Sequence, residues 1–235
     1  MATTPEVAEK APPNRRQVLI AAAGAAVVLV AGGAGYYWWS KPEPAPSGGA
    51  TLTPDVPMAD LMAPGPLGDE ALGDPKAPVT IVEYASMTCP HCAHFHETAF
   101  PELKKKYIDT GKVRFIFREF PLDPVAAGAS ALARCAGKDK FFPLIESLFA
   151  QQRDWAVQRP VEPMFAIVRQ AGFSRQSFEE CLNNQKILQG IDETRTRGQH
   201  YGVQSTPTFF INGKLFRGVL TAEELDKQLA PYLKG

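Results

Sequence analysis

The pattern of apolar and polar positions divides the chain into unlike parts. An uncharged apolar run of about 22 residues covers residues 18–39, and a stretch rich in Pro, Gly and Ala covers residues 40–68. From residue 69 onward, apolar positions recur with the periods of strands and helices. The sequence therefore predicts one folded domain, residues 69–235, that follows an apolar segment and a linker.

The first elements of the domain form a crossover unit. Residues 79–84 are a β-branched run typical of a mostly buried strand. Residues 93–107 have helical spacing, in which Pro101 is expected to bend the helix and Gly111 to end it. A second strand is predicted at residues 113–118. Because a strand–helix–strand connection is a right-handed crossover, we expect the two strands to be parallel.

The remaining elements complete the predicted fold. A helical block is predicted at about residues 123–201, and Asn212-Gly213 between two short apolar runs is a strong hairpin signal. Residues 221–224 read Thr-Ala-Glu-Glu, a capping box that begins a last helix. This order predicts an α/β fold with a mixed central sheet flanked by helices, a helical insertion and an antiparallel hairpin at one edge.

The apolar segment, residues 18–39, is long enough to cross a bilayer as a helix. The pair Arg15-Arg16 precedes it and aromatic residues 36–39 end it, which is a positive-inside arrangement with an interfacial belt. We therefore expect residues 1–17 to be a cytoplasmic tail and the segment to be an anchor in the inner membrane. A cleaved signal peptide is the alternative, and its export route stays open because the arginine pair partly matches a twin-arginine signal.

The composition of the linker and the net charge of the chain indicate which partners to expect. Residues 40–68 cannot form a packed core and predict a partly extended tether. Their one apolar piece, residues 58–62, is expected to dock on the domain or a partner and is too short for a dimerisation domain, so we expect a monomer. The chain has 25 Lys+Arg and 25 Asp+Glu. Because no net positive charge is available for a phosphate backbone, nucleic acid is not an expected partner.

The candidate chemistry lies in Cys89-Pro90-His91-Cys92, at the predicted strand-to-helix junction. Unpaired backbone N–H groups and the positive end of the helix dipole stabilise an anion there, so Cys89 is expected to be the acidic, accessible thiol. Cys92, one turn further on, is expected to resolve the mixed disulfide that Cys89 forms. His91 can donate to the thiolate or pair with it, which would make the disulfide a stronger oxidant.

A second motif, Thr206-Pro207, precedes the hairpin. A proline that enters a sheet is tolerated at an edge or at the start of a strand, often after a cis bond. If this bond is cis, the backbone there can lie over the cysteine pair. It would then position an extended substrate chain by β-type hydrogen bonds.

These motifs together resemble the DsbA-like thiol:disulfide oxidoreductases of the thioredoxin superfamily, in the family's order, over residues 68–233. The resemblance implies a thioredoxin fold interrupted by a helical domain, and no cofactor beyond the Cys89–Cys92 disulfide. It also implies oxidation of cysteines in exported proteins and reoxidation by a quinone-linked membrane partner of the DsbB type. Glu83 falls where the family carries a buried acid, which either moves protons to and from Cys92 or is simply hydrogen-bonded.

The expected function is therefore that of a dithiol oxidase at the periplasmic face of the bacterial inner membrane, or in the periplasm if the signal is cleaved. An isomerase or a reductase for particular clients is the enzymatic alternative, because threonine before the proline is commoner in isomerase-like relatives. An inert buried cysteine pair is disfavoured by the strand–helix setting and the downstream proline.

A non-catalytic metal chaperone is the alternative from another class. The candidate ligands are Cys89, His91, Cys92, His94 and His96. On a helix, however, Cys92 and His96 share a face while His94 points away, so one metal ion cannot bind them all. No metal is expected, and His94 and His96 are interpreted as surface or packing residues.

Two further cysteines, Cys135 and Cys181, lie in separate predicted helices of the insertion. Two neighbouring thiols are expected to pair in an oxidising compartment, so a structural disulfide is predicted. Two unrelated core cysteines are the alternative.

Overall fold

The structure, a computed structural model, describes residues 55–233. The predicted cytoplasmic tail, the apolar segment 18–39 and the linker as far as residue 54 lie outside the described residues. Among the helices of residues 55–233, none combines the length and the apolar character that crossing a bilayer requires.

The described chain contains a five-stranded mixed sheet with the strand order β1-β3-β2-β4-β5. The strands are β1 (Glu70–Leu72), β2 (Val79–Ala85), β3 (Val113–Glu119), β4 (Thr208–Ile211) and β5 (Lys214–Arg217). β2 and β3 are parallel, as predicted from the crossover, and the β4–β5 hairpin forms an antiparallel edge. The short strand β1, which pairs with β3 in antiparallel fashion, was not predicted.

Strand β2 lies in the middle of this sheet and leads into the candidate site. It pairs with β3 on one side and β4 on the other, and all but one of its residues are buried. Such two-sided burial explains the unbroken apolar character of the segment. Glu83 is the one charged residue of this strand, and its side chain is fully buried.

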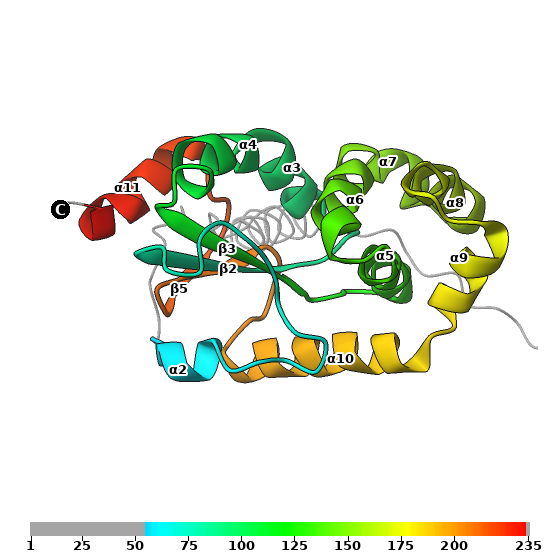
Figure 1. The fold of residues 1–235 in the computed structure, drawn as a ribbon, viewed down its shortest axis with the longest axis horizontal. Helices are drawn as coiled ribbons and strands as arrows, with labels where there is room; N and C mark the ends of the chain where they lie inside the picture. Colours follow the sequence, from blue (N-terminus) through cyan, green and yellow to red (C-terminus); the bar gives the residue numbers. More distant parts are fainter. Residues whose placement is uncertain (1–54, 234–235) are drawn as a thin grey trace, which may run out of the picture. The chain divides into compact units, whose positions relative to one another are not determined.

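Helices cover both faces of the sheet, as predicted (Figure 1). The helical elements before the insertion are α2 (Met58–Leu61), α3 (Pro90–Thr98), α4 (Phe100–Leu103) and the π-helical turn η1 (Lys104–Ile108). The others are α5 (Pro124–Cys135), α6 (Lys138–Ala150), α7 (Gln152–Trp155), α8 (Val161–Val168), the 3-10 turn η2 (Arg169–Ala171), α9 (Arg175–Leu182), α10 (Gln185–His200) and α11 (Ala222–Leu233). In Figure 1, α3, α4 and α11 lie along one face of the sheet, and α2 and α10 along the other.

The first long helical segment is interrupted near the proline that predicted a bend. α3 ends at Thr98 and α4 begins at Phe100, with Pro101 in its first turn. A proline lacks the N–H donor and its ring crowds the preceding turn, so the break falls just before it. The segment then ends at Ile108, and the turn that follows contains Gly111, whose φ of +73° suits a residue without a side chain.

The helical insertion runs from α5 to α10 and corresponds to the predicted block. Three of its helices begin at polar caps: the side chains of Asp123, Ser174 and Asn184 accept backbone hydrogen bonds at the starts of α5, α9 and α10. A disulfide bond joins Cys135 in α5 to Cys181 in α9. This is the pair that the sequence predicted, and it links two helices of the insertion.

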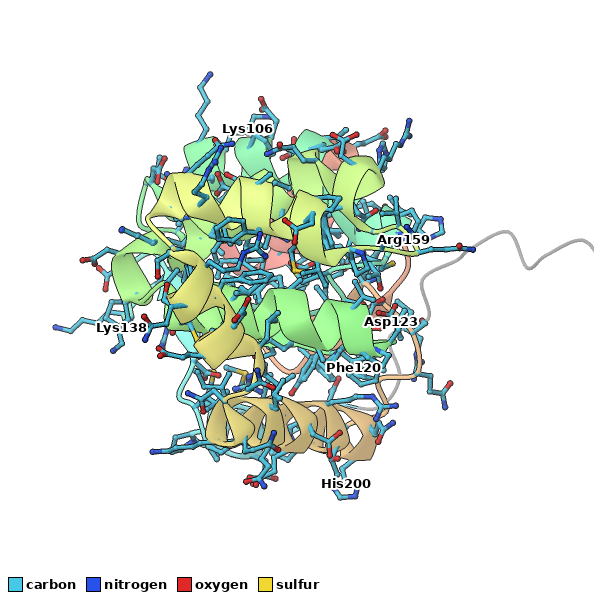
Figure 2. All side chains as sticks on the ribbon, turned by 90° about the vertical axis from the view of Figure 1, so that its right-hand side faces the viewer. Lys106, Phe120, Asp123, Lys138, Arg159 and His200 are labelled. Atoms are coloured by element: carbon cyan, nitrogen blue, oxygen red, sulfur yellow. A yellow bond between two sulfur atoms is a disulfide. The ribbon has the colours of Figure 1, made fainter. Side chains whose placement is uncertain are left out.

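α10 returns from the insertion along the sheet, and a glycine permits its close approach. A Cβ atom at Gly198 would lie 2.7 Å from the ring of Tyr84 and 3.2 Å from Phe120. Figure 2 shows Phe120 between α5 and α10. Any larger residue at position 198 would push α10 away from the sheet.

Part of the predicted linker packs on the domain. Within the range 40–68, the described residues include Leu61, which is fully buried, and Val56, whose N–H donates to Gly213 O at 2.9 Å. Arg118 Nη2 donates to Leu61 O at 2.7 Å, and its guanidinium also pairs with Asp69. Residues 58–62 therefore dock on the domain, one of the two expected outcomes, and the packed region begins before the expected boundary at residue 69.

Candidate active site

Cys89 occupies the N-cap of α3, with the extended backbone angles of a cap residue. Pro90 follows at the first helical position, where its missing N–H costs nothing because that group has no helical partner. Cys89 is 6% exposed and Cys92 is fully buried, and both are free thiols in this structure. The structure therefore shows the reduced form of the pair.

The environment of Cys89 favours its thiolate and lowers the pKa of this thiol from 9.0 to about 5. The largest cause is a hydrogen bond from the Cys92 side chain, and partial burial opposes it. Smaller lowering contributions come from the Thr206 side chain and from the backbone amides of Cys92 and His91. Cys89 is therefore the acidic thiol that was expected, but the Cys92 hydrogen bond contributes more than the backbone amides of the helix start, and the sulfur is buried rather than accessible.

Cys92 has the opposite character. Burial raises the pKa of its thiol well above 9.0, and the hydrogen bond to Cys89 and the negative charge of Glu83 raise it further. The two sulfurs therefore have separate tasks at one pH: Cys89 carries the charge and Cys92 carries the proton.

Thr206-Pro207 lies directly against Cys89. The peptide bond between them is cis, and Cys89 Sγ lies 3.2 Å from Thr206 O. The hydroxyl Oγ1 of Thr206 is buried and has no hydrogen-bond partner among the described residues, and the Thr206 side chain nevertheless lowers the pKa of the Cys89 thiol. β4 begins at the next residue, Thr208, which pairs with Tyr84 of β2. This pairing brings the proline motif beside the cysteine motif.

Glu83 forms a buried pair with His96 that the sequence did not reveal. Glu83 Oε2 and His96 Nε2 are 2.9 Å apart, and the two side chains are 0% and 1% exposed. The His96 ring stacks on Phe149, with 4.5 Å between the ring centroids. From the sequence, His96 was expected to be a surface or packing residue, and it is buried. The i, i+4 spacing from Cys92 showed that the two share a helix face, but not that an acid of β2 faces them.

Polar residues from the insertion also hold the cysteine loop, and the sequence did not single them out. Gln152 Nε2 of α7 donates to Met87 O at 2.8 Å and to Cys89 O at 3.0 Å. Asp123 Oδ2 accepts from Thr88 Oγ1 at 2.5 Å, and Figure 2 shows Asp123 at the start of α5. The insertion therefore fixes the loop between β2 and α3 from two sides.

The remaining histidines of the motif point to solvent. His91 and His94 are exposed, whereas His96 is buried. The backbone N–H of His91 lowers the pKa of the Cys89 thiol. A role for the His91 imidazole stays a prediction. Within residues 55–233, no three His, Cys, Asp or Glu side chains are grouped as a metal site would need.

Comparison with known proteins places the chain in a family. A thioredoxin family model matches residues 67–230. A Rickettsia conorii relative named as a protein-disulfide oxidoreductase is 40% identical over 148 residues, which are 62% of this chain and 53% of the relative. "Disulfide bond formation protein D" of Bacillus subtilis is 26% identical over 174 residues, 72% of this chain and 78% of that protein. The chain spans about half the length of the Rickettsia relative.

A solved structure is also similar to this chain. The crystal structure of alpha-DsbA1 from Wolbachia pipientis superposes with a TM-score of 0.66 at 32% sequence identity, covering 70% of this chain and 90% of that one. The chain belongs to the thioredoxin family and, within it, to the DsbA-like proteins. The resemblance expected from the motifs is thereby confirmed, and so is the thioredoxin-like fold.

Proposed function

We propose that this protein is a thiol:disulfide oxidoreductase that introduces disulfide bonds into other proteins through Cys89 and Cys92. The observation that carries the proposal is the Cys89 sulfur, held at the start of α3 with its pKa lowered to about 5. A thiolate stabilised in the reduced form is a good leaving group, and it makes the corresponding disulfide oxidising. The names of the relatives point to the same chemistry.

In the proposed reaction a client thiolate attacks the Cys89 sulfur of the Cys89–Cys92 disulfide. The Cys89–Cys92 bond breaks, a bond between the client and Cys89 forms, and Cys92 leaves as a thiolate that takes up one proton. A second client thiolate then attacks the client sulfur of this mixed disulfide, and Cys89 leaves as a thiolate. The client becomes a disulfide, and its two electrons reside on the enzyme dithiol.

The other site residues support these two steps. Pro90 and His91 form the loop between the cysteines, and the backbone N–H of His91 helps to stabilise the Cys89 anion. Thr206 and Pro207 lie against the reacting sulfur, where the backbone is placed to pair with an extended client segment. Glu83 is proposed to exchange the proton of Cys92, because its charge acts on that thiol. No cofactor is proposed beyond the cysteine pair itself.

We further propose that the protein works on the periplasmic side of the inner membrane, on exported proteins that contain cysteines. The apolar segment 18–39, as an anchor or a cleaved signal, supports export of the domain. The Cys135–Cys181 disulfide supports an oxidising compartment, because such bonds rarely persist in a reducing cytosol. A quinone-linked membrane protein of the DsbB type is the proposed electron acceptor.

A redox titration tests the direction of the reaction. The purified protein is equilibrated with mixtures of reduced and oxidised glutathione, and the fraction of Cys89–Cys92 disulfide is measured by alkylation and mass spectrometry. An oxidase should have a potential near that of oxidising DsbA-type couples, roughly −120 mV, and well above the roughly −270 mV of thioredoxin. A Cys89→Ser variant should not oxidise a reduced peptide substrate. A potential as low as that of thioredoxin contradicts the oxidase proposal.

A further inference from the structure

A cleft of about 380 Å³ opens directly beside the cysteine motif. Residues of α3 form one wall, and residues 149–154, from the end of α6 and from α7, form the other. Pro90, the neighbour of Cys89, lies at one end of the α3 wall, and Glu97 lies at the other. The two residues are seven positions apart on the helix, which corresponds to about 10 Å. The cleft therefore begins at the redox centre and extends away from it along α3.

A buried side chain of this cleft has an acceptor without a donor. Gln152 is 7% exposed, and both hydrogen bonds of its side chain are donations by Nε2, to Met87 O and Cys89 O. Its amide oxygen, Oε1, accepts no hydrogen bond from another described residue. Because buried amide oxygens are normally paired, this oxygen favours a ligand that brings an N–H donor.

The charges of the cleft favour a cation. The carboxylates of Glu97 and Asp154 line it together with the guanidinium of Arg153, and none of the three makes an ion pair with another described residue. α6 ends at Ala150 in the same cleft, and the C-terminus of a helix carries partial negative charge. His94 is the remaining titratable side chain there. Two carboxylates and a helix C-terminus therefore outweigh the one guanidinium.

The dimensions and the apolar part of the cleft suit a long basic side chain. Ala93 and Phe149 line it and are buried. Lysine and arginine lay their methylene stems along such apolar surface and keep the charged head at polar groups. Three residues of extended chain span about 10 Å, which matches the length of the α3 wall. A client residue three positions from the cysteine that bonds to Cys89 is thus far enough along the chain to reach Glu97.

We propose that this cleft is a client subsite, which binds a lysine or arginine side chain about three residues from the client's reactive cysteine. This inference rests on the proposed function and names the class of client segment that the site prefers. The cation pairs with Glu97 and Asp154 and donates to Gln152 Oε1. It takes part in no covalent step, and it holds the client while the two exchange steps at Cys89 proceed.

Peptide oxidation measures the preference. Three dithiol peptides of one sequence carry lysine, norleucine or glutamate three positions after the first cysteine, and a second set carries them three positions before it. Each peptide is mixed with the oxidised protein, the reaction is quenched with acid, and the rate constant is obtained by mass spectrometry. In at least one set the lysine peptide should react fastest and the glutamate peptide slowest. The difference should shrink in about 1 M salt, which screens exposed charges.

The test variant is the double substitution Glu97→Gln, Asp154→Asn. Its matched control is Glu146→Gln, Glu179→Gln, which removes two exposed carboxylates outside the cleft and makes the same change in net charge. A lysine near a thiol also changes the reactivity of the peptide itself, but this effect is the same for every variant, so ratios of rates isolate the cleft. The lysine-to-norleucine ratio should fall roughly threefold to fivefold in the test variant, the effect of losing an exposed ion pair. It should keep its wild-type value in the control.

An equilibrium measurement gives the preference without turnover. In a Cys92→Ala background, single-cysteine versions of the peptides displace glutathione from a mixed disulfide with Cys89, and one glutathione thiol is released for each peptide bound. The lysine-to-norleucine ratio of equilibrium constants should fall in the test variant by a similar factor. The proposal is overturned if either ratio is the same in the test and control variants, or if the glutamate peptides are preferred. Failure of the proposed function looks different, because the wild-type protein would then oxidise none of the peptides while the equilibrium ratios still report on the cleft.

Discussion

The sulfur of Cys89 lies 3.2 Å from the carbonyl oxygen of Thr206, although the two residues are 117 positions apart in the sequence. The contact exists because β2 and β4 are neighbours in the sheet, so that the loop after one strand meets the loop before the other. It places the Cys89 sulfur between the start of α3 and the Thr206-Pro207 backbone, where a client chain is proposed to pair. The redox chemistry therefore depends on strand order as much as on the cysteine motif.

The low pKa of Cys89 predicts its reactivity towards alkylating agents. In a Cys92→Ala background, the rate of iodoacetamide alkylation should rise with pH to a plateau, with a midpoint above about 5 but below 9.0, because the hydrogen bond from Cys92, the largest cause of the low pKa, is lost while the smaller contributions remain. The measurement is a pH series followed by mass spectrometry, with thiolate absorbance of the wild-type protein as a second readout. A midpoint near 9 would contradict the electrostatic account of the site.

The same shift predicts a pH dependence of stability for the reduced protein. Because the folded-state pKa of Cys89 is depressed, from 9.0 to about 5, the thiolate stabilises the fold above pH 5 and this contribution is lost as the pH falls through 5. At pH 7 it amounts to roughly 2 to 3 kcal/mol, at about 1.4 kcal/mol per pKa unit. The reduced wild type should therefore lose more stability than Cys89→Ala between pH 7 and pH 4 in denaturant titrations. Parallel curves for the two proteins would show that Cys89 makes no such contribution.

The Thr206 hydroxyl should contribute to the anion's stability. Replacing Thr206 by Val keeps the shape but removes the buried hydroxyl of a side chain that lowers the pKa of Cys89, so this pKa should rise, by roughly one unit at most. The reduction potential should fall accordingly, while the stability of the oxidised protein stays the same or increases. Thr206→Ser is the control, because it retains the hydroxyl and should keep the wild-type pKa in the alkylation assay. Equal pKa values in Val and Ser variants would exclude this role.

Gln152 should couple the insertion to the cysteine loop. Its amide donates to the carbonyl oxygens of Met87 and Cys89, so Gln152→Ala leaves two acceptors without this donor. We expect a loss of roughly 1 to 3 kcal/mol in the free energy of unfolding, measured by urea titration of the reduced protein. Gln151→Ala is the matched control, because the side chain of Gln151 donates to Ser147 O of α6 at an exposed position and not to the cysteine loop. Similar losses in both variants would mean that the contacts to the loop are unimportant.

The Cys135–Cys181 disulfide should stabilise the insertion independently of the active site. The bond closes a loop with a sequence separation of 46, which corresponds to about 4 kcal/mol in the chain-entropy model. A double Cys135→Ala, Cys181→Ala variant should unfold at lower denaturant concentration, while its Cys89 alkylation profile is unchanged. In the folded wild type without reductant, neither cysteine should be alkylated. Ready alkylation of both would show that the bond is absent in solution.

Much of the fold follows from local patterns. Three examples are the buried strand β2, the bend near Pro101 and the hairpin at Asn212-Gly213. Each depends on the backbone preferences and the apolar pattern of residues within a few positions, which the sequence shows directly. The short elements β1 and α2 were missed for the same reason. Three or four residues carry too little periodicity, and these segments are ordered by contacts with β3 and with Arg118.

The sequence by itself determined the residues of the proposed site: two cysteines at the start of a helix, with a proline motif before a later strand. Only the tertiary structure decided which groups surround them. His96 pairs with Glu83, and the buried Arg118 pairs with Asp69. Gln152 donates a hydrogen bond to the cysteine loop. The physical reason is that burying a polar or charged group is tolerated only with a partner in place. For these groups the partner comes from another element of the fold, and no local pattern reveals it.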